Sequence, residues 1–346
     1  MSPRIEIVYV CCFRFDVRVR AECDDIFQGA GAFSLPVDGA SSGHGRCNTI
    51  QDAQQIIDLF VRYSETNRKI DTSRIYGAGT SEQMLAKIDI QGCSIDTKVN
   101  PKPGDFAPIR LRSIFLESVE ALKPHKIHTF YLHLPDRSVP IEETLRAVND
   151  LYLEGYFEEF GLSNYNSWEV AQIVCIAQAN GWIKPTVYQG LYNAVERNVE
   201  VELIPCLRTF GIRFYAYSPL ASGVLTGKIL TEAEMSAPGG RWDPKVSFLA
   251  GFLQGQYGPM LPAVRELKEG LDKHNIPLSE AAHRWLQHHS VLSPEHGDTV
   301  IIGASNIDQL ENNLRESERG SLPEEVVTLI DAAWKNAKAH TRHYAF

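Results

Sequence analysis

Residues 127–179 read IHTFYLHLPDRSVPIEETLRAVNDLYLEGYFEEFGLSNYNSWEVAQIVCIAQA, and their pattern decides the fold class. Residues 127–134 form a short run rich in apolar and aromatic side chains, which predicts a strand. Pro140 then opens a segment of helical period at residues 141–154. A second strand at residues 157–162 and a second helix follow directly. Two strand–helix units in succession indicate a parallel sheet with helices packed on it.

The same alternation continues on both sides of this stretch. The predicted strands lie at residues 26–35, 69–73, 94–100, 127–134, 157–162, 186–189, 212–217 and 299–303. Helical segments lie between them, one starting at Thr49 with Asp52 three residues on, and one that Ser167 opens. A length of 346 residues allows about two domains or one large barrel. Eight strand–helix units favour a single (β/α)8 barrel (TIM barrel) over an open doubly wound sheet.

Three segments lie outside this repeat. Residues 1–25 are assigned to an N-terminal extension and residues 26–346 to the barrel domain. Residues 13–20 of the extension alternate apolar and charged, which leaves two alternatives open: a strand capping one mouth of the barrel, or a poorly ordered tail. Residues 218–257 form a long loop after strand seven, of a length typical of a functional lid. Residues 323–339 predict one more helix after strand eight.

Composition excludes several classes of function. The chain has 34 Lys and Arg against 43 Asp and Glu, a net charge of −9, and no basic stripe, which argues against nucleic-acid binding. No apolar run approaches the ~20 residues of a spanning helix, so no membrane contact is expected. Residues 5–13 only weakly resemble a signal-peptide core. Seven cysteines without framework spacing are typical of reduced thiols and favour a cytoplasmic protein.

Polar side chains follow three neighbouring strands of the predicted barrel, where the function of such a fold lies. Asp71 and Tyr76 follow strand two, Lys98 follows strand three, and His133 follows strand four. Taken singly, Asp71 and Lys98 read as a buried stabilising pair and His133 as a core histidine. Taken together they support a mechanism, because a lysine ammonium favours tyrosinate and makes Tyr76 a better proton donor to a carbonyl oxygen. Asp71 keeps the lysine charged, and a neutral histidine orients the substrate.

The order of these residues resembles that of a known family. The string Asp71-Thr-Ser-Arg-Ile-Tyr76-Gly77, followed by Lys98 and His133, resembles the aldo-keto reductases, whose tetrad is Asp, Tyr, Lys and His. The resemblance continues in Gly-Leu-Ser-Asn-Tyr from residue 161, Val-Tyr-Gln from 187, Tyr-Ser-Pro-Leu from 217 and Ile-Gly-Ala-Ser-Asn from 302. It covers roughly residues 26 to 340. Residues 161–170 and 182–193 look most like the aflatoxin aldehyde reductase branch.

The resemblance implies a role for each matching residue. Tyr76 would be the general acid, tuned by Lys98 and Asp71, with His133 orienting the carbonyl. The residues implied for NADPH or NADP+ are Ser163, Asn164 and Gln189 at the carboxamide, Tyr217 on the nicotinamide ring, Ser218, Leu220 and Lys228 at the pyrophosphate, and Ser305, Gln309, Asn312 and Asn313 at the adenosine end. A helix N-terminus after strand eight can also receive a phosphate.

Two arginines and several absent motifs complete the prediction. Arg241 is a candidate for gripping a substrate carboxylate or the cofactor phosphate, and Arg74 faces either the pocket or its rim. Residues 303–313 contain no basic side chain to select NADPH over NADH, a role left to Lys228 or Arg241. No metal-ligand spacing, no Gly-x-Ser-x-Gly elbow and no complete dinucleotide fingerprint is present, so no metal is expected and cofactor binding rests on the barrel.

The sequence therefore predicts an NADPH-dependent oxidoreductase that reduces small carbonyl compounds, namely dialdehydes, semialdehydes, aromatic aldehydes or reactive ketones, to alcohols. Two alternatives stay open. One is a nucleotide-binding regulatory subunit of the same fold with little turnover, and the other is an aryl-alcohol dehydrogenase. The branch resemblance also implies a homodimer.

Overall fold

The computed structural model of the chain describes residues 6–10, 49–63, 68–237, 242–243, 250–304 and 306–346. Eight parallel strands pair in chain order and close into a barrel, since β1 bonds to both β2 and β8. The strands are β1 (Glu6–Val10), β2 (Lys69–Asp71), β3 (Ser94–Val99), β4 (Ile127–Leu132), β5 (Glu159–Ser163), β6 (Pro185–Leu191), β7 (Arg213–Tyr217) and β8 (Thr299–Ile302).

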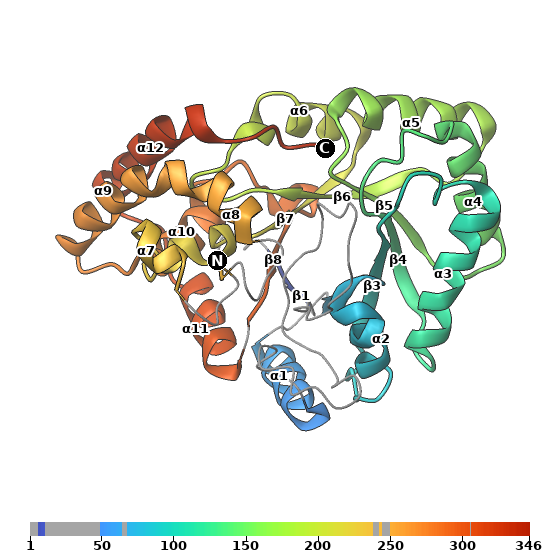
Figure 1. Ribbon diagram of the computed structural model, residues 1–346, viewed down its shortest axis with the longest axis horizontal. Coiled ribbons are helices and arrows are strands. Elements are labelled where there is room, and N and C mark those ends of the chain that lie inside the picture. Colours follow the sequence, from blue (N-terminus) through green and yellow to red (C-terminus); the bar gives the residue numbers. More distant parts are fainter. Residues whose placement is uncertain (1–5, 11–48, 64–67, 238–241, 244–249, 305) are drawn as a thin grey trace.

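Helices surround the barrel (Figure 1). They are α1 (Ile50–Tyr63), α2 (Thr80–Leu85), α3 (Pro108–Leu122), α4 (Ile141–Leu153), α5 (Ser167–Asn180), α6 (Leu203–Phe210), α7 (Glu232–Met235), α8 (Ala250–Tyr257), α9 (Leu261–Asp272), α10 (Leu278–His288), α11 (Ile307–Ser317) and α12 (Glu324–Ala337). Short 3-10 turns include η1 (Tyr76–Gly79) and η3 (Ala221–Thr226). Among the described residues, no helix combines the length and the apolar character needed to cross a bilayer.

Local sequence explains where the helices begin. The Thr49 hydroxyl accepts a hydrogen bond from the Asp52 amide at 3.0 Å and satisfies a free donor in the first turn of α1. Asn166 and Glu169 form a reciprocal capping box at the start of α5. Pro140 stands just before α4, where its missing N–H costs nothing. The helix starts predicted at these three places are confirmed.

Alternation along the strands divides the core into two layers. Side chains two residues apart on one strand lie on the same face. On β3, Thr97 contacts α2, whereas Asp96 and Lys98 lie on the other face with the ion pairs of the barrel interior. Outside the barrel the packing is apolar: the rings of Phe115 on α3 and Phe130 on β4 are 4.5 Å apart, and both side chains are fully buried. The interior therefore carries the Asp96 and Lys98 ion pairs, while this outer contact between α3 and β4 is apolar.

The first strand corrects the sequence-based assignment. Seven strands stand where they were predicted, but the barrel begins with β1 at Glu6–Val10, inside the segment assigned to an extension. The predicted strand at residues 26–35 lies outside the described residues, as does the alternating run at 13–20. The run Glu-Ile-Val-Tyr-Val has the apolar, β-branched character of a strand paired on both sides. The boundary at residue 26 is therefore wrong for residues 6–10.

The segment after β7 is long, as expected, and part of it is regular. It includes η3, α7 and α8, while residues 238–241 and 244–249 lie outside the described part of the chain. The C-terminal helix predicted at residues 323–339 is confirmed as α12, which packs on α9.

Candidate active site

Four predicted site residues meet at the carboxyl ends of β2, β3 and β4. Asp71 ends β2, Tyr76 begins the turn η1 that follows it, Lys98 lies on β3, and His133 directly follows β4. Lys98 Nζ donates to Asp71 Oδ2 at 2.5 Å and to the Thr72 carbonyl oxygen at 2.9 Å. The same ammonium lies 5.4 Å from the centroid of the Tyr76 ring. The rings of Tyr76 and His133 are 6.0 Å apart and nearly perpendicular, at 84°.

Burial governs the electrostatics of this group. Asp71 and Lys98 are each 1% exposed, Tyr76 5% and His133 7%. Burial raises the pKa of Asp71, against the opposing effect of the Lys98 charge and hydrogen bond. Burial and the nearby Lys98 ammonium hold the pKa of His133 well below its ordinary value, so the imidazole is neutral at pH 7. The Asp71–Lys98 pair is buried, as expected of a pair that only stabilises the fold. It nevertheless stands beside the Tyr76 phenol and the neutral His133 imidazole.

A serine fixes the orientation of the histidine. Ser73 Oγ donates to the Lys98 carbonyl oxygen at 2.9 Å and lies 3.3 Å from His133 Nδ1. This hydroxyl thus joins the backbone of β3 to the imidazole that follows β4. Ser73 is not among the residues predicted from the sequence, although it lies between two predicted site residues, Asp71 and Tyr76, in the same motif.

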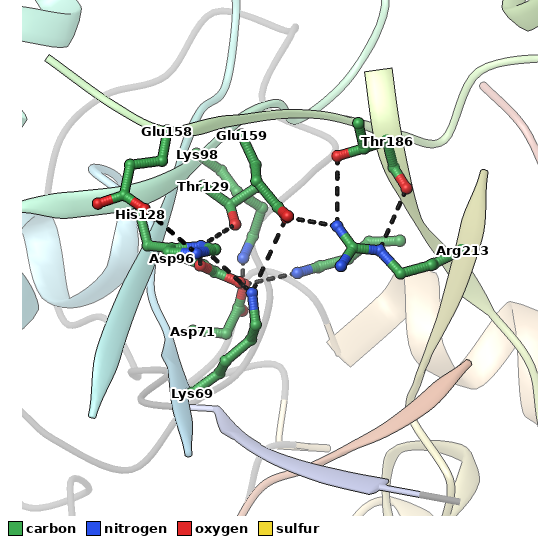
Figure 2. A network of polar contacts seen from close by, with 11 residues as sticks. Lys69, Asp71, Asp96, Lys98, His128, Thr129, Glu158, Glu159, Thr186 and Arg213 are labelled. Carbon is green, nitrogen blue, oxygen red and sulfur yellow. Dashed lines mark hydrogen bonds and ion pairs between the residues drawn. The ribbon is translucent and has the colours of Figure 1, made fainter. Parts of the chain in front are cut away.

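A second group lies at the ends of β5, β6 and β7. Asn164 Nδ2 donates to Ser163 Oγ at 2.8 Å and to the His133 carbonyl oxygen at 3.0 Å. The Tyr217 hydroxyl donates to Asn164 Oδ1 at 2.8 Å. Gln189 Nε2 donates to Asp71 Oδ1 at 2.5 Å and so belongs to the same polar cluster as Lys98 (Figure 2 shows the lysine–aspartate pair). The structure therefore brings these four predicted residues next to the first group.

The turn after β7 has a conformation suited to anions. Ser218, Ala221 and Ser222 have φ values of 58°, 48° and 55°, in the left-handed region that non-glycine residues seldom adopt. Successive turn residues of this kind form concave backbone surfaces that bind phosphate groups. Leu220 is half-buried within the turn, and Lys228 is exposed beyond it.

Three of the predicted adenosine residues, Gln309, Asn312 and Asn313, lie on α11. Asn306 caps this helix, its Oδ1 accepting from the Gln309 amide at 2.9 Å. Asn313 is buried and donates to the Gly303 carbonyl oxygen at 3.3 Å, whereas Asn312 is exposed. Ser305 and Arg241 lie outside the described residues.

Arg74 does not join the cluster. Its Nη1 donates to Glu82 Oε2 on α2 at 2.5 Å, and its Nε lies 3.9 Å from Glu117 on α3. The guanidinium therefore lies between two helices outside the barrel, where it pairs with carboxylates of the chain itself. Of the two orientations left open for Arg74, toward the pocket or toward its rim, this placement on α2 and α3 favours the rim.

Two further features approach the site. Tyr131 is fully buried on β4 and its ring lies 5.7 Å from Lys98 Nζ. The C-terminal segment reaches the site as well, because the Phe346 amide donates to the Asn164 carbonyl oxygen at 3.2 Å. The Arg342 guanidinium lies 4.6 Å from the Phe252 ring and 4.4 Å from the Phe346 ring. The two-residue spacing between Tyr131 and His133 on one predicted strand was a sequence signal for Tyr131. No feature of the neighbouring sequence indicates that the C-terminal residues contact Asn164 and Phe252.

Comparison with known proteins identifies this arrangement. The model of the Aldo/keto reductase family matches residues 39–335. The chain belongs to the aldo-keto reductase family. It is 43% identical to an aldo-keto reductase of Pseudocercospora fijiensis over 285 residues, 80% of this chain and 96% of the other. It is 43% identical to mouse aflatoxin B1 aldehyde reductase member 2 over 79% of this chain and 77% of the other, and 42% identical to human member 4 over 77% and 84%.

These relatives confirm the resemblance to the aflatoxin aldehyde reductases. The aldo-keto reductase described here is an oxidoreductase of the aldehyde-reductase type. Within the described part of the chain, no group of three His, Cys, Asp or Glu side chains is arranged to hold a metal ion.

Proposed function

We propose that this aldo-keto reductase reduces aldehydes and reactive ketones to alcohols with NADPH, and that Tyr76 supplies the proton. The observation that carries the proposal is the meeting of Tyr76, Lys98, Asp71 and His133 at the carboxyl end of the barrel. Enzymes of this fold carry out their chemistry at that end.

Tyr76 is the general acid in this proposal. An ordinary tyrosine has a pKa near 10 and is a weak donor at neutral pH. The Lys98 ammonium, 5.4 Å from the ring centroid, stabilises the tyrosinate that remains after proton transfer. Asp71 holds the ammonium in place through a 2.5 Å contact. The proton thus passes from the Tyr76 hydroxyl to the carbonyl oxygen as the carbon is reduced.

His133 orients the carbonyl group. Its imidazole is neutral, so it does not repel the Lys98 ammonium and does not compete with Tyr76 as an acid. The Ser73 hydroxyl at 3.3 Å holds the ring, and the edge-on arrangement of His133 and Tyr76 supports the binding of one substrate oxygen by both groups. Holding the reacting oxygen between two fixed groups lowers the entropic part of the barrier.

The described residues fit a nicotinamide dinucleotide. Ser163, Asn164 and Gln189 offer amide and hydroxyl groups for a carboxamide, and Tyr217 beside them offers a ring for the nicotinamide. The left-handed turn at Ser218 suits a pyrophosphate. The remaining contacts are assigned to Leu220, Lys228, Ser305, Gln309, Asn312 and Asn313. When bound, the cofactor supplies the hydride.

A cationic group favours substrates that carry an anion, such as semialdehydes. Arg342 is a candidate for this group: its guanidinium lies 4.4 Å from the Phe346 ring, and the Phe346 amide donates to the Asn164 carbonyl oxygen. Burial raises the pKa of Tyr217 to about 12, and the Arg342 charge acts against that rise. Dialdehydes and aromatic aldehydes fit the same proposal. Two relatives are named for aflatoxin B1 aldehyde reduction.

The test compares Tyr76→Phe with Tyr131→Phe. Both rings flank Lys98, at 5.4 and 5.7 Å, but only Tyr76 contacts His133. We expect Tyr76→Phe to lower kcat for aldehyde reduction by about 10²- to 10⁴-fold, because general acid catalysis contributes that much, and Tyr131→Phe to retain most of the rate. A Tyr76→Phe enzyme that turns over at the wild-type rate rules out the proposed acid.

The same purified protein separates the alternatives. Quenching of NADPH fluorescence without turnover of any aldehyde in a broad panel would indicate a regulatory nucleotide-binding protein. Faster oxidation of aryl alcohols than reduction of aldehydes at cellular cofactor ratios would indicate an aryl-alcohol dehydrogenase. The proposed homodimer is tested by sedimentation equilibrium.

A further inference from the structure

A buried carboxylate connects the segment that carries Tyr76 to the strand that carries Lys98. Glu82 on α2 is fully buried. Its Oε2 accepts from Arg74 Nη1 at 2.5 Å, and its Oε1 accepts from Thr97 Oγ1 at 2.7 Å. Arg74 stands two residues before Tyr76, and Thr97 directly precedes Lys98. Each oxygen of Glu82 is therefore bound to one of the two segments that place the proposed acid and its ammonium neighbour.

The turn is shaped to receive the arginine. Gly79, the last residue of η1, has φ of +89°, and a Cβ there would lie 1.9 Å from Arg74 Nη2. Only a glycine leaves this space and adopts this backbone conformation without strain. The guanidinium consequently packs against the end of the turn that begins at Tyr76.

Backbone contacts transmit this restraint to the lysine strand. The Arg74 amide donates to the Lys98 carbonyl oxygen at 3.1 Å, and the Tyr76 amide donates to the Ser73 carbonyl oxygen at 3.0 Å. The Lys98 carbonyl thus accepts from the segment before Tyr76, while Glu82 binds the side chains on the outer face of the same two segments. Side-chain and backbone contacts fix the same relative position.

We propose that Glu82, Arg74 and Thr97 form a clamp of positioning residues that sets the distance between Tyr76 and Lys98, and thereby the acidity of Tyr76. This inference rests on the proposed function. The effect of the ammonium on the phenol varies inversely with their separation and is strong in a buried site. Small displacements of a reacting group also carry large rate penalties. None of the three clamp side chains touches substrate in this scheme, so their influence passes through Tyr76.

The chain contains a matched control pair. Arg208 on α6 binds Asp298 bidentately, Nη1 lying 2.9 Å from Oδ1. The side-chain exposures are 19% for Arg208 and 0% for Asp298, against 18% for Arg74 and 0% for Glu82. Asp298 also accepts from the Phe214 amide at the start of β7. The two ion pairs are alike in burial and charge, but Arg208 and Asp298 have no contact with the Tyr76 turn.

The experiment compares Arg74→Met with Arg208→Met in the full-length protein. Both substitutions leave a buried carboxylate without its arginine, so both lower the melting temperature. Only Arg74→Met is expected to lower kcat, by about 10- to 100-fold, with KM and the NADPH dissociation constant near wild type. It should also shift the basic limb of the kcat–pH profile to higher pH, because a phenol farther from the ammonium is a weaker acid.

A second set of variants avoids the loss of a charge. Thr97→Val removes one hydrogen bond to Glu82 while keeping the β-branched shape, and Thr97→Ser restores the hydroxyl. We expect Thr97→Val to shift the pH profile in the same direction as Arg74→Met, and Thr97→Ser to return it to the wild-type position. If Glu82 only stabilises the fold, these variants will change the melting temperature and leave the kcat–pH profile unchanged.

The outcomes separate the clamp from the function on which it rests. The clamp is overturned if Arg74→Met and Thr97→Val keep the wild-type kcat and pH profile while Tyr76→Phe is inactive. It is also overturned if Arg208→Met loses kcat to the same degree, because the effect would then reflect general stability. A fully active Tyr76→Phe enzyme would instead refute the proposed acid.

Discussion

Strands β2 and β3 carry two lysine–aspartate pairs, one toward each end of the barrel interior. On β2 the order is Lys69 then Asp71, and on β3 it is Asp96 then Lys98. Asp71 and Asp96 lie opposite each other, so each aspartate pairs diagonally with the lysine of the other strand. The upper pair, Lys98–Asp71, is 2.5 Å apart, whereas Lys69 Nζ and Asp96 Oδ2 are 3.8 Å apart. The same two residue types thus form one tight and one loose pair.

The surroundings of the two pairs differ more than the pairs themselves. The lower pair belongs to a network of opposite charges, in which Lys69 lies 4.0 Å from Glu159 and Glu159 pairs with Arg213 (Figure 2). Both pairs have a phenol ring and an imidazole nearby, Tyr215 and His128 at the lower pair and Tyr76 and His133 at the upper pair. The upper set stands at the carboxyl ends of the strands, where His133 is neutral. A charge surrounded by its counter-charges stabilises the barrel, whereas a charge beside an ionisable hydroxyl can change that hydroxyl's chemistry.

The largest difference is expected on removing the upper lysine. Lys98→Met should lower kcat for aldehyde reduction by about 10²- to 10⁴-fold, because Tyr76 loses the charge that stabilises its anion. Burial already raises the pKa of Asp71, so this carboxyl can take a proton when its partner is removed, and the fold should persist. Stopped-flow and steady-state rates, with circular dichroism as the control for folding, check this. A wild-type rate would remove Lys98 from the mechanism.

The lower lysine should give the opposite result. Lys69→Met leaves the fully buried Asp96 without its lysine, and we expect the free energy of unfolding to fall by about 3 kcal/mol at pH 8. The kcat of the folded enzyme should stay close to wild type, since Lys69 lies in the other network. Urea unfolding and steady-state kinetics on one preparation measure both quantities. A large loss of kcat with unchanged stability would contradict the division between the two pairs.

The smallest expected effect is on the pH dependence of folding stability, through Asp96 of the lower pair. Burial alone would raise the pKa of Asp96, but the Lys69 charge and the neighbouring His128 and Thr129 side chains hold it below its usual value of 3.8. A carboxyl with a lowered folded-state pKa contributes stability above pH 3.8, and that contribution is lost as the pH falls through the folded-state pKa. The stability difference between wild type and Asp96→Asn should therefore shrink from pH 5 to pH 3. If this stability difference instead grows as the pH falls from 5 to 3, folding raises the pKa of Asp96 and does not lower it.

Local sequence located most of the barrel but not its first strand. Seven strands coincide with apolar runs that were predicted, because each run is bounded by turn residues and followed by a helical period. The strand Glu6–Val10 is as apolar as the others, yet its place depends on pairing with β2 and with β8, nearly 300 residues away. Such long-range pairing leaves no trace in the neighbouring residues.

The active site also has one part that the sequence predicts and another that depends on tertiary contacts. The residue types and order of Asp71, Tyr76, Lys98 and His133 predicted the cluster, because parallel strands bring their carboxyl ends to one rim. Arg74 shows the limit: its place between a strand and Tyr76 left the pocket and its rim both open, and its guanidinium lies with Glu82 and Glu117. The direction of a long side chain is set by the charges that surround it, and these come from α2 and α3.

The sequence by itself determined the strand–helix order, the family and the identity of the four central polar residues, because these follow from local periodicity and from motif order. Only the tertiary structure decided which partner each charge takes. It paired Lys98 with Asp71 and Lys69 with Asp96 on adjacent strands, and it turned Arg74 toward Glu82. Two lysines and two aspartates within one pair of strands allow several pairings, and the choice depends on the register and on the burial that the closed barrel imposes.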